Sequence, residues 1–506
     1  MAVACLALAP LVYLAVRASD ATGGPLDLIL RPRTIEVLAN TLVLALVVGA
    51  AAVAVGLPLG WLTTRTDLPG RRLWAVLVVV PLAIPSYVLA FALIATLGPG
   101  GAVRDLLAPL GVERLPSMYG FPGAALVLTL ATYPYVTLAV RAVIRRTDAG
   151  LEEAARTLGD PPHRAVRRII LPLLVPAASA GALLAILYAL ADFGSVSLLQ
   201  FDSFARAIYV QYRAAFDRSL AAVLALVLAG LAIGVALLEA AVRNRRPPVV
   251  ARPGARPAAP LPLGRWRWPA VAFCGSVVLL ALVVPVVTLT GWLLRGLASG
   301  EPLRVLPDAI GNTVLAGAAA CAVAVIIALP VALLAGRWPG RAVRVIEASS
   351  LTAYALPGIV VALAVVFLAI RLGPAVYQTL GLLVLAYAVR FLPLAVAPLR
   401  DAIATISPRV EESARVLGRS PAATFREVTL PLLRPGLLAG AALVFLTTVK
   451  ELPMTLILGP AGFRTLATSV WSGVGDGFYA RAAAPALVLI AISIAGVGLL
   501  LREERS

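Results

Sequence analysis

The sequence has few charged residues, one lysine and one histidine. Only 13% of its 506 residues are charged, about half the share of an ordinary soluble domain, which excludes a soluble enzyme with a water-facing surface. A phosphate-binding P-loop needs a lysine followed by serine or threonine. The single lysine, Lys450, precedes Glu451, so the chain cannot bind ATP through such a loop. The single histidine, His163, excludes zinc sites built on histidine pairs.

Cysteine is also scarce. Cys5, Cys274 and Cys321 lie far apart inside apolar runs and have the spacing of neither metal ligands nor a disulfide framework. We expect three small, buried hydrophobic side chains. The sequence therefore predicts no catalytic residue, no metal site and no bound cofactor.

Apolar sequence, in contrast, is abundant. Hydrophobic residues make up 61% of the chain, and the mean hydropathy is +0.96. A bilayer span needs roughly 20 apolar residues and must be a helix, because a lone strand cannot satisfy its backbone in lipid. For the first run the alternative is a signal peptide, but it lacks a basic n-region and a cleavage site. We predict an all-α polytopic membrane protein with about twelve spans, at 2–18, 38–63, 73–97, 121–140, 171–191, 219–242, 268–294, 310–335, 346–370, 377–399, 436–459 and 482–501.

Arginine placement indicates how these spans are oriented. The net charge of +18 comes from arginines between the apolar runs, where they set membrane orientation more naturally than they bind nucleic acid. With a cytoplasmic N-terminus, 28 arginines fall in cytoplasmic segments and 13 in outer loops. We therefore predict that both termini are cytoplasmic. The Pro- and Arg-rich stretch 243–267 is interpreted as a cytoplasmic linker, extended or disordered.

The sequences on the two sides of the linker resemble each other. Early positions match at one constant offset and later positions at a smaller one, because an outer loop near 98–120 is longer than its counterpart near 371–376. Six spans separate equivalent points and an even number preserves direction, so we expect two parallel six-helix repeats with a pore at their interface. The predicted domains are a first module, 1–242, the linker, and a second module, 268–506. Positions matched at the larger offset include Thr41 and Thr313, Arg65 and Arg337, and Pro85 and Pro357; those at the smaller offset include Gly159 and Gly418, and Pro172 and Pro431.

Two of the predicted cytoplasmic loops, 141–172 and 400–431, share the motif E-A/S-A-x3-G-x9-I/V-x-L-P. Ser407 suits a helix N-cap, and Gly159 and Gly418 fall where a helix end needs positive φ. We expect two short helices joined by a sharp turn in each loop. Such a rigid helical projection would be a docking element for another protein. The alternative, an ordinary amphipathic loop, does not explain the repetition at equivalent places. The motif positions are Glu153, Ala154, Ala155, Gly159, Leu171 and Pro172 in the first loop and Glu412, Ser413, Ala414, Gly418, Leu430 and Pro431 in the second.

This motif resembles the EAA motif of permease subunits of ABC importers, and the resemblance covers nearly the whole chain as two fused modules. It implies the type I importer fold, in which each loop forms a coupling helix that inserts into a groove of a separate ATPase subunit. Transferred by position, Glu153, Gly159, Glu412 and Gly418 would transmit movement between the ATPase and the spans. The implied partners are an ATPase homodimer, an extracytoplasmic substrate-binding protein and the lipid bilayer, while the chain itself would catalyse no reaction.

Two further segments resemble the fused permeases of ferric-iron importers. They read YALADFGSVSLLQ (188–200) and TTVKELPMTLILG (447–459), and their ADFG and KELP stretches are similar to those of that family. The resemblance implies Fe3+ as the cargo, selected largely by the binding protein. Fused permeases for thiamine and for phosphonates are the nearest alternatives, together with those for other small oxyanions and polyamines.

Two acids stand at equivalent positions near the ends of predicted spans. Asp192 and Glu451 are candidates to line the pathway or its gate, because an acid at membrane depth usually has a function. The alternative is a charge at a helix end that is paired locally, with Lys450 as the partner of Glu451.

One arginine and two prolines also lie inside predicted spans. Arg390 is expected either to pair with an acid in the bundle or to line a water-filled path. Pro85 and Pro357 should break their helices at matching depths, as in gate-lining discontinuous helices, and a plain kink is the alternative.

Two other classes of protein fit part of the sequence. A twelve-span secondary transporter would have the same length and parallel repeats, but it would need no paired docking motifs. A membrane-embedded enzyme, such as a lipid-modifying transferase, is disfavoured by the scarcity of histidine and lysine and by the lack of a clustered nucleophilic or metal-ligating set.

Overall fold

The structure is a computed structural model, and every regular element in the part it describes is a helix. Nine of these helices are long and apolar enough to span a membrane, and two helix pairs bent at a break bring the number to eleven. The shorter apolar helix α1 (Ala2–Ser19) coincides with the first predicted span, 2–18. The described residues are 2–19, 24–98, 101, 103–104, 108–110, 117–148, 150, 152–153, 157–159, 161, 164, 166–214, 219–244, 259–301, 306–338 and 340–503.

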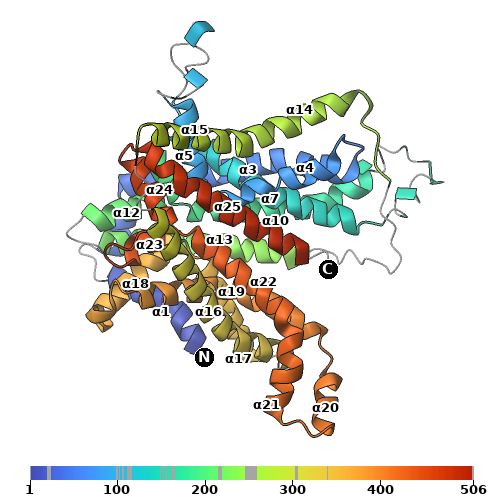
Figure 1. Ribbon diagram of the computed structural model, residues 1–506, viewed down its shortest axis with the longest axis vertical. Helices are drawn as coiled ribbons and strands as arrows, with labels where there is room; N and C mark the ends of the chain where they lie inside the picture. Colours follow the sequence, from blue (N-terminus) through green and yellow to red (C-terminus); the bar gives the residue numbers. More distant parts are fainter. Residues whose placement is uncertain are drawn as a thin grey trace. The chain divides into compact units, whose positions relative to one another are not determined.

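Contacts divide the chain into two compact units (Figure 1). One, here called the first-half unit, consists of Leu30–Ala207 and Gly230–Gly296. Its elements are α3 (Pro32–Arg65), α4 (Arg71–Leu77), η1 (Val80–Ala83), α5 (Ser86–Leu97), η2 (Ala108–Leu110), α7 (Phe121–Arg146), η3 (Val166–Ile170), α10 (Leu171–Ala191), α11 (Gly194–Leu198), η4 (Gly264–Trp266), α14 (Arg267–Val278), η5 (Leu279–Val283) and α15 (Val284–Ala298).

The other, the second-half unit, consists of Met1–Ile29, Ile208–Ala229 and Leu297–Ser506. The helices α12 (Phe204–Ala214) and α13 (Ser219–Asn244) are divided between the units. The remaining elements are α1, α2 (Pro25–Ile29), α16 (Leu306–Arg337), α17 (Arg341–Ala355), α18 (Gly358–Leu372), η6 (Pro374–Val376), α19 (Leu380–Thr405), α20 (Pro408–Val416), α21 (Pro421–Thr424), η7 (Phe425–Thr429), α22 (Leu430–Val449), α23 (Pro453–Leu458), α24 (Leu466–Gly475) and α25 (Tyr479–Glu503).

Each unit is built around three mutually packed long helices, α3, α7 and α10 in one and α16, α19 and α22 in the other. Glycine permits the close approach in both. A Cβ on Gly181 of α10 would lie 2.6 Å from the Cα of Val136 of α7, and a Cβ on Gly440 of α22 would lie 3.0 Å from the Cα of Ala395 of α19. The two contacts are equivalent at the smaller repeat offset. Small residues at such crossings let apolar helices pack in a membrane, where no hydrophobic effect drives them together.

The first helix of each half belongs to the unit formed mainly by the other half. Helix α1 packs against α17 and α18 in the second-half unit. In the first-half unit, Gly275 of α14 faces Trp74, and the hydroxyls of Thr96 and Thr288 are hydrogen-bonded at 2.6 Å. The two packing units therefore do not coincide with the two halves of the chain. The predicted domain boundaries at 242 and 268, which divide the repeats along the chain, stay a prediction.

The linker differs in part from its predicted extended or disordered state. Helix α13 continues to Asn244 and η4 begins at Gly264, so the two ends of the stretch are helical. Leu261 exchanges backbone hydrogen bonds with the segment Arg65–Asp67, since its N–H donates to the Arg65 carbonyl at 2.8 Å and its carbonyl accepts from Asp67 N–H at 3.1 Å. Its middle, 245–258, lies outside the described residues.

The cysteine prediction is correct only in part. Cys274 is buried and Cys321 is half-buried, but Cys5 is exposed. Cys5 lies on α1, whose apolar surface is only partly covered by α17 and α18.

Candidate functional site: docking loops and helix breaks

The loop 400–431, here called the second docking loop, is a helical hairpin beyond the end of α19. Pro408 takes the first position of α20 after Ser407, whose backbone is extended (φ −64°, ψ 131°). Gly418 turns the chain with φ 85°, and the Ser420 hydroxyl then accepts a hydrogen bond from Ala423 N–H (3.2 Å) at the start of α21. Figure 1 shows α20 and α21 projecting beyond α19 and α22 of the same unit.

The loop 141–172, here called the first docking loop, has the same turn. Gly159 has φ 90°, so the positive φ predicted for both motif glycines is confirmed. Glu153 is exposed, as is Glu412 in the second loop. The predicted motif positions Ala154 and Ala155 lie outside the described residues.

The tip of each docking loop carries an exposed leucine, which the motif-based prediction missed. Leu158 is 88% exposed and Leu417 is 82% exposed, and each directly precedes the turn glycine. Ala414, in contrast, is buried on the inner face of α20. Apolar side chains held out on a projecting element are typical of an interaction surface. The Leu-Gly pair that recurs in both copies of the motif could have indicated these exposed leucines from the sequence.

Each docking loop returns to its span through one turn of π-helix, which the sequence did not predict. These turns, η3 and η7, occupy equivalent positions at the smaller repeat offset. Pro172 and Pro431 follow them directly, near the starts of α10 and α22. Proline has no N–H and its ring collides with the carbonyl four residues earlier, so a wider turn relieves the conflict. Leu171 and Leu430 are the first residues of the two spans.

Pro85 and Pro357 mark sharp breaks, not plain kinks. Helices on the two sides of Pro85 are bent by 98°, and those on the two sides of Pro357 by 108°. Each proline has extended backbone dihedrals and directly precedes a new helix, α5 or α18. The predicted helix breaks at matching places are therefore confirmed.

Asp192 lies at the end of α10 and is buried. Its Oδ1 accepts hydrogen bonds from Ser195 N–H (3.0 Å), Ser195 Oγ–H (2.5 Å) and Val196 N–H (3.3 Å), and its Oδ2 accepts one from the Ser86 hydroxyl. The carboxylate thus caps α11 and ties it to the first residue of α5. This junction joins the break at Pro85 to the turn after α10.

Glu451 occupies the equivalent place in the second-half unit. Its Oε1 accepts a hydrogen bond from Met454 N–H (3.3 Å), and its Oε2 lies 3.1 Å from Arg390 Nη1. The acid partner predicted for Arg390 is therefore present. Lys450 is the C-cap residue of α22, directly beside this pair.

The two junctions reach the same arrangement with different side chains. At the position equivalent to Ser86 the second half has Gly358, and at the position equivalent to Arg390 the first half has Ala131. A Cβ on Gly358 would collide with Glu451 Oε1 and lie 2.8 Å from Arg390 Nη1. Glycine at 358 thus leaves room for the larger ion pair, where the first half has the smaller Ser–Asp pair.

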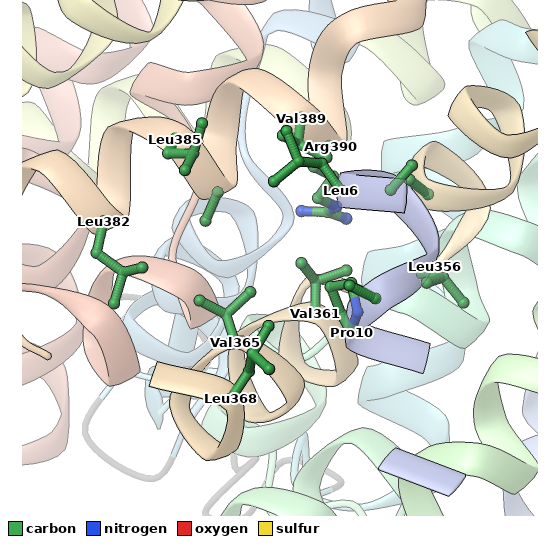
Figure 2. A pocket seen from close by; sticks show the side chains of 14 residues that line it. Leu6, Pro10, Leu356, Val361, Val365, Leu368, Leu382, Leu385, Val389 and Arg390 are labelled. Carbon is green, nitrogen blue, oxygen red and sulfur yellow. The ribbon is translucent and has the colours of Figure 1, made fainter. Parts of the chain in front are cut away.

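Neither junction has the chemistry of a metal centre. Both carboxylates are engaged by protein donors, and within the described ranges no three His, Cys, Asp or Glu side chains are close enough to hold a metal ion. A cavity of about 100 Å³ lies between α1, α17, α18 and α19 (Figure 2). Apart from Arg390, the labelled side chains of its wall are apolar.

Comparison with known proteins places these features in a family. Residues 56–246 and 324–502 each match the model of the binding-protein-dependent transport system inner membrane component. This chain belongs to that family. The permease carries one family module in each half and is a multi-pass membrane protein, the transport subunit of an ABC importer and not an enzyme. Its partners are an ATPase and a substrate-binding protein, so a secondary transporter and a membrane enzyme are excluded.

Three relatives illustrate the range of the family. The permease is 31% identical to the Fe(3+)-transport system permease protein FbpB 2 of Haemophilus influenzae, over 96% of this chain and 93% of the relative. It is 24% identical to the ferric transport system permease protein FbpB of Actinobacillus pleuropneumoniae, over 91% and 70%. A probable molybdenum ABC transporter permease of Haloferax volcanii is 31% identical, over 45% of this chain and 81% of the relative.

Proposed function

We propose that the permease forms the translocation pathway for ferric iron delivered by an extracytoplasmic binding protein. The observation that carries the proposal is the extent of similarity to a relative named for Fe(3+) transport, which covers 96% of the chain. Relatives named for molybdenum and sulfate match 45% and 34% of the chain, about the length of one module. Thiamine, a phosphonate or another small solute is the second candidate, as in other importers of this class.

Uptake of radiolabelled Fe3+ tests the cargo. A strain that lacks the gene should lose ATP-dependent Fe3+ uptake at low external iron, and the full chain should restore it. The same cells given radiolabelled thiamine or phosphonate serve as controls. Normal Fe3+ uptake in the deletion strain would overturn the iron proposal and leave the permease assignment in place.

The proposed orientation puts both termini and both docking loops in the cytoplasm, where the loops contact an ATPase homodimer. The support is the arginine distribution and the exposed leucines Leu158 and Leu417 at equivalent places in the two loops. Glu153 and Glu412 are proposed as exposed polar contacts with the ATPase, and Gly159 and Gly418 as the turns that shape the docking loops.

Valine at both turn glycines tests the docking role. Nothing lies within 4 Å of a Cβ at Gly159 or Gly418, so the substitution acts through the positive φ, which a β-branched residue tolerates poorly. We expect Gly159→Val with Gly418→Val to lose copurification of the ATPase. Gly462→Val is the matched control, because Gly462 also has positive φ (78°) and open space but lies outside both loops. Unchanged copurification in the double variant would contradict the docking role.

The two junctions are proposed to hold the gate-lining segments of the pathway. Pro85 and Pro357 set the breaks, Asp192 and Glu451 join each break to the turn after a long helix, and Arg390 and Lys450 accompany Glu451. Support comes from the equivalence of the two junctions and from the 98° and 108° bends. In this proposal the carboxylates position backbone and do not ligate the cargo.

A further inference from the structure

An ion pair attaches the second docking loop to a span that the chain does not connect to it. Arg337, the last residue of α16, places Nη2 2.8 Å from Oε1 of Glu411 in the first turn of α20. The Thr429 hydroxyl in η7 donates to the same oxygen at 3.0 Å. The two charged side chains are 14% and 18% exposed, so this is a largely buried contact and not a surface pair.

The first docking loop has the equivalent pair. Arg65, the last residue of α3, pairs through Nη2 with Glu152, and their side chains are 5% and 12% exposed. Arg65 matches Arg337 at the larger offset of the repeat, and Glu152 matches Glu411 at the smaller one. Each glutamate directly precedes the motif glutamate. The same contact, made twice at equivalent positions, is a built feature of the module.

The pair changes how a docking helix is held. The chain connects α20 to α19 on one side and, through α21 and η7, to α22 on the other. The Arg337–Glu411 contact adds α16, the third helix of the packed core. A displacement of α20 then moves all three core helices, α16, α19 and α22, together. Without the pair, the hairpin could swing about Ser407 and the π-turn η7 while α16 stayed in place.

We propose that Arg65–Glu152 and Arg337–Glu411, here called the tether pairs, are positioning residues that couple movement of the docking helices to the spans. The inference rests on the proposed docking of these loops to the ATPase and adds a coupling role for residues outside the contact itself. A buried ion pair adds little net stability, because desolvation offsets its attraction, but losing one partner strands the other charge. Such a pair therefore fixes the position of the docking loop relative to the span more than it stabilises the fold.

The linker reinforces the first tether. Arg65 Nη1 also donates to the carbonyl of Ala259, and Leu263 N–H donates to Asp67 Oδ1 at 2.8 Å. The linker segment thus fixes the backbone that carries Arg65. The second tether has no linker contact to remove as well, among the residues that the structure describes, so the test is made there.

The experiment uses the full chain assembled with its ATPase subunits and binding protein in liposomes. The variant Arg337→Ala with Glu411→Ala should keep ATPase copurification and hydrolysis within about twofold, while Fe3+ transported per ATP falls by about fivefold or more, the lower range of typical coupling. Each single variant should be worse than the double one, because it leaves an unpaired buried charge. The matched control is Arg481→Ala with Glu301→Ala, an ion pair at 2.9 Å that lies outside both loops and should leave transport per ATP unchanged.

Three results separate the possibilities. If Fe3+ per ATP stays at the wild-type value, and total uptake falls no more than the amount of assembled complex, the coupling role is overturned. The reversed pair Arg337→Glu with Glu411→Arg should recover most of the coupling, and failure to exceed the alanine pair would also overturn the inference. If the wild-type chain itself captures no ATPase, the docking proposal fails, which is distinguishable from failure of the tether.

Discussion

Asp192 and Glu451 hold the same place in the repeat, yet their charges are satisfied differently. Asp192 receives hydroxyl and backbone hydrogen bonds, whereas Glu451 faces the guanidinium of Arg390. Four positions of the two junctions differ together. Ser86, Ala131, Asp192 and Ser195 in one half correspond to Gly358, Arg390, Glu451 and Met454 in the other. The first set satisfies its carboxylate by hydrogen bonds alone, and the second adds an ion pair. The chain therefore holds two equivalent junctions with two different sets of side chains.

This correspondence predicts that the side chains of the second junction can be replaced by those of the first. Arg390→Ala alone should lower the free energy of unfolding by about 3 kcal/mol or more, because it strands a buried carboxylate. The quadruple variant Gly358→Ser, Arg390→Ala, Glu451→Asp and Met454→Ser should recover most of that loss. Thermal unfolding of the purified permease measures both. A quadruple variant as unstable as the single one would show that the two junctions are not interchangeable.

The exposed leucines give a second prediction at this scale. Leu158→Ser with Leu417→Ser should change the free energy of unfolding by no more than about 0.5 kcal/mol, since surface substitutions rarely do more. Capture of the ATPase should nevertheless fall at least tenfold, as for a truncated apolar hot spot. Leu26→Ser, at a 72% exposed leucine outside the docking loops, is the control for general effects of removing surface apolar area. If both variants captured equal amounts of ATPase, the leucines at the loop tips would have no specific role in docking.

At the scale of elements, the π-turns η3 and η7 stand between each docking loop and its span. An extra residue in a turn rotates everything before it by about 100° relative to an α-helix. The turn therefore sets the direction in which the hairpin projects. Its cause is the proline that follows, because Pro431 cannot accept α-helical geometry from the preceding turn without a clash.

Replacing this proline should move the docking loop without unfolding the span. Pro431→Ala is expected to let η7 relax toward α-helix, keep or raise thermal stability, and reduce transport per assembled complex severalfold. Hydrogen exchange at 425–431 would report the change of turn. Pro435→Ala, one turn further into α22, is the control because Pro435 is not preceded by a π-turn. Full transport by Pro431→Ala would mean that the loop direction is set elsewhere.

Most of the elements could be predicted from the sequence, because runs of about 20 apolar residues have few options in a bilayer. The turn glycines and the proline breaks followed from backbone chemistry at single residues. The π-turns, the tether pairs and the identity of the acid that pairs with Arg390 did not, since each depends on which helices pack together. The eleventh predicted span, 436–459, was placed too far along the chain: α22 runs from Leu430 to Val449, and Glu451 caps a separate helix, α23.

At the scale of the whole molecule, the exchange of first helices joins the two halves of the chain. The contacts of α1 with α17 and α18 involve residues of opposite halves, and the same holds for α14–α15 in the first-half unit. Covalent continuity is thus only one of the connections between the halves. The linker adds a further one at Leu261, which pairs with the end of α3.

The permease should therefore survive division into two chains. Residues 1–244 and 259–506, produced together, are expected to copurify through a tag on the second piece, because each contributes its first helix to the other unit. A first piece that starts at residue 24, and so lacks α1, should be recovered in several-fold lower yield. Pieces that separate fully in mild detergent would show that the exchanged helices do not hold the halves together.

The position of α1 also sets the order in which the protein can be completed during synthesis. Its packing partners α17 and α18 begin only in the second half of the chain, at Arg341 and Gly358. At about 5–20 residues per second, α1 waits in the membrane for roughly twenty seconds to a minute before those helices exist. During that interval its inner face, including Leu14, which ends fully buried, must be covered by lipid or by the insertion machinery. The nascent chain thus keeps α1 unassembled until well into translation of the second half.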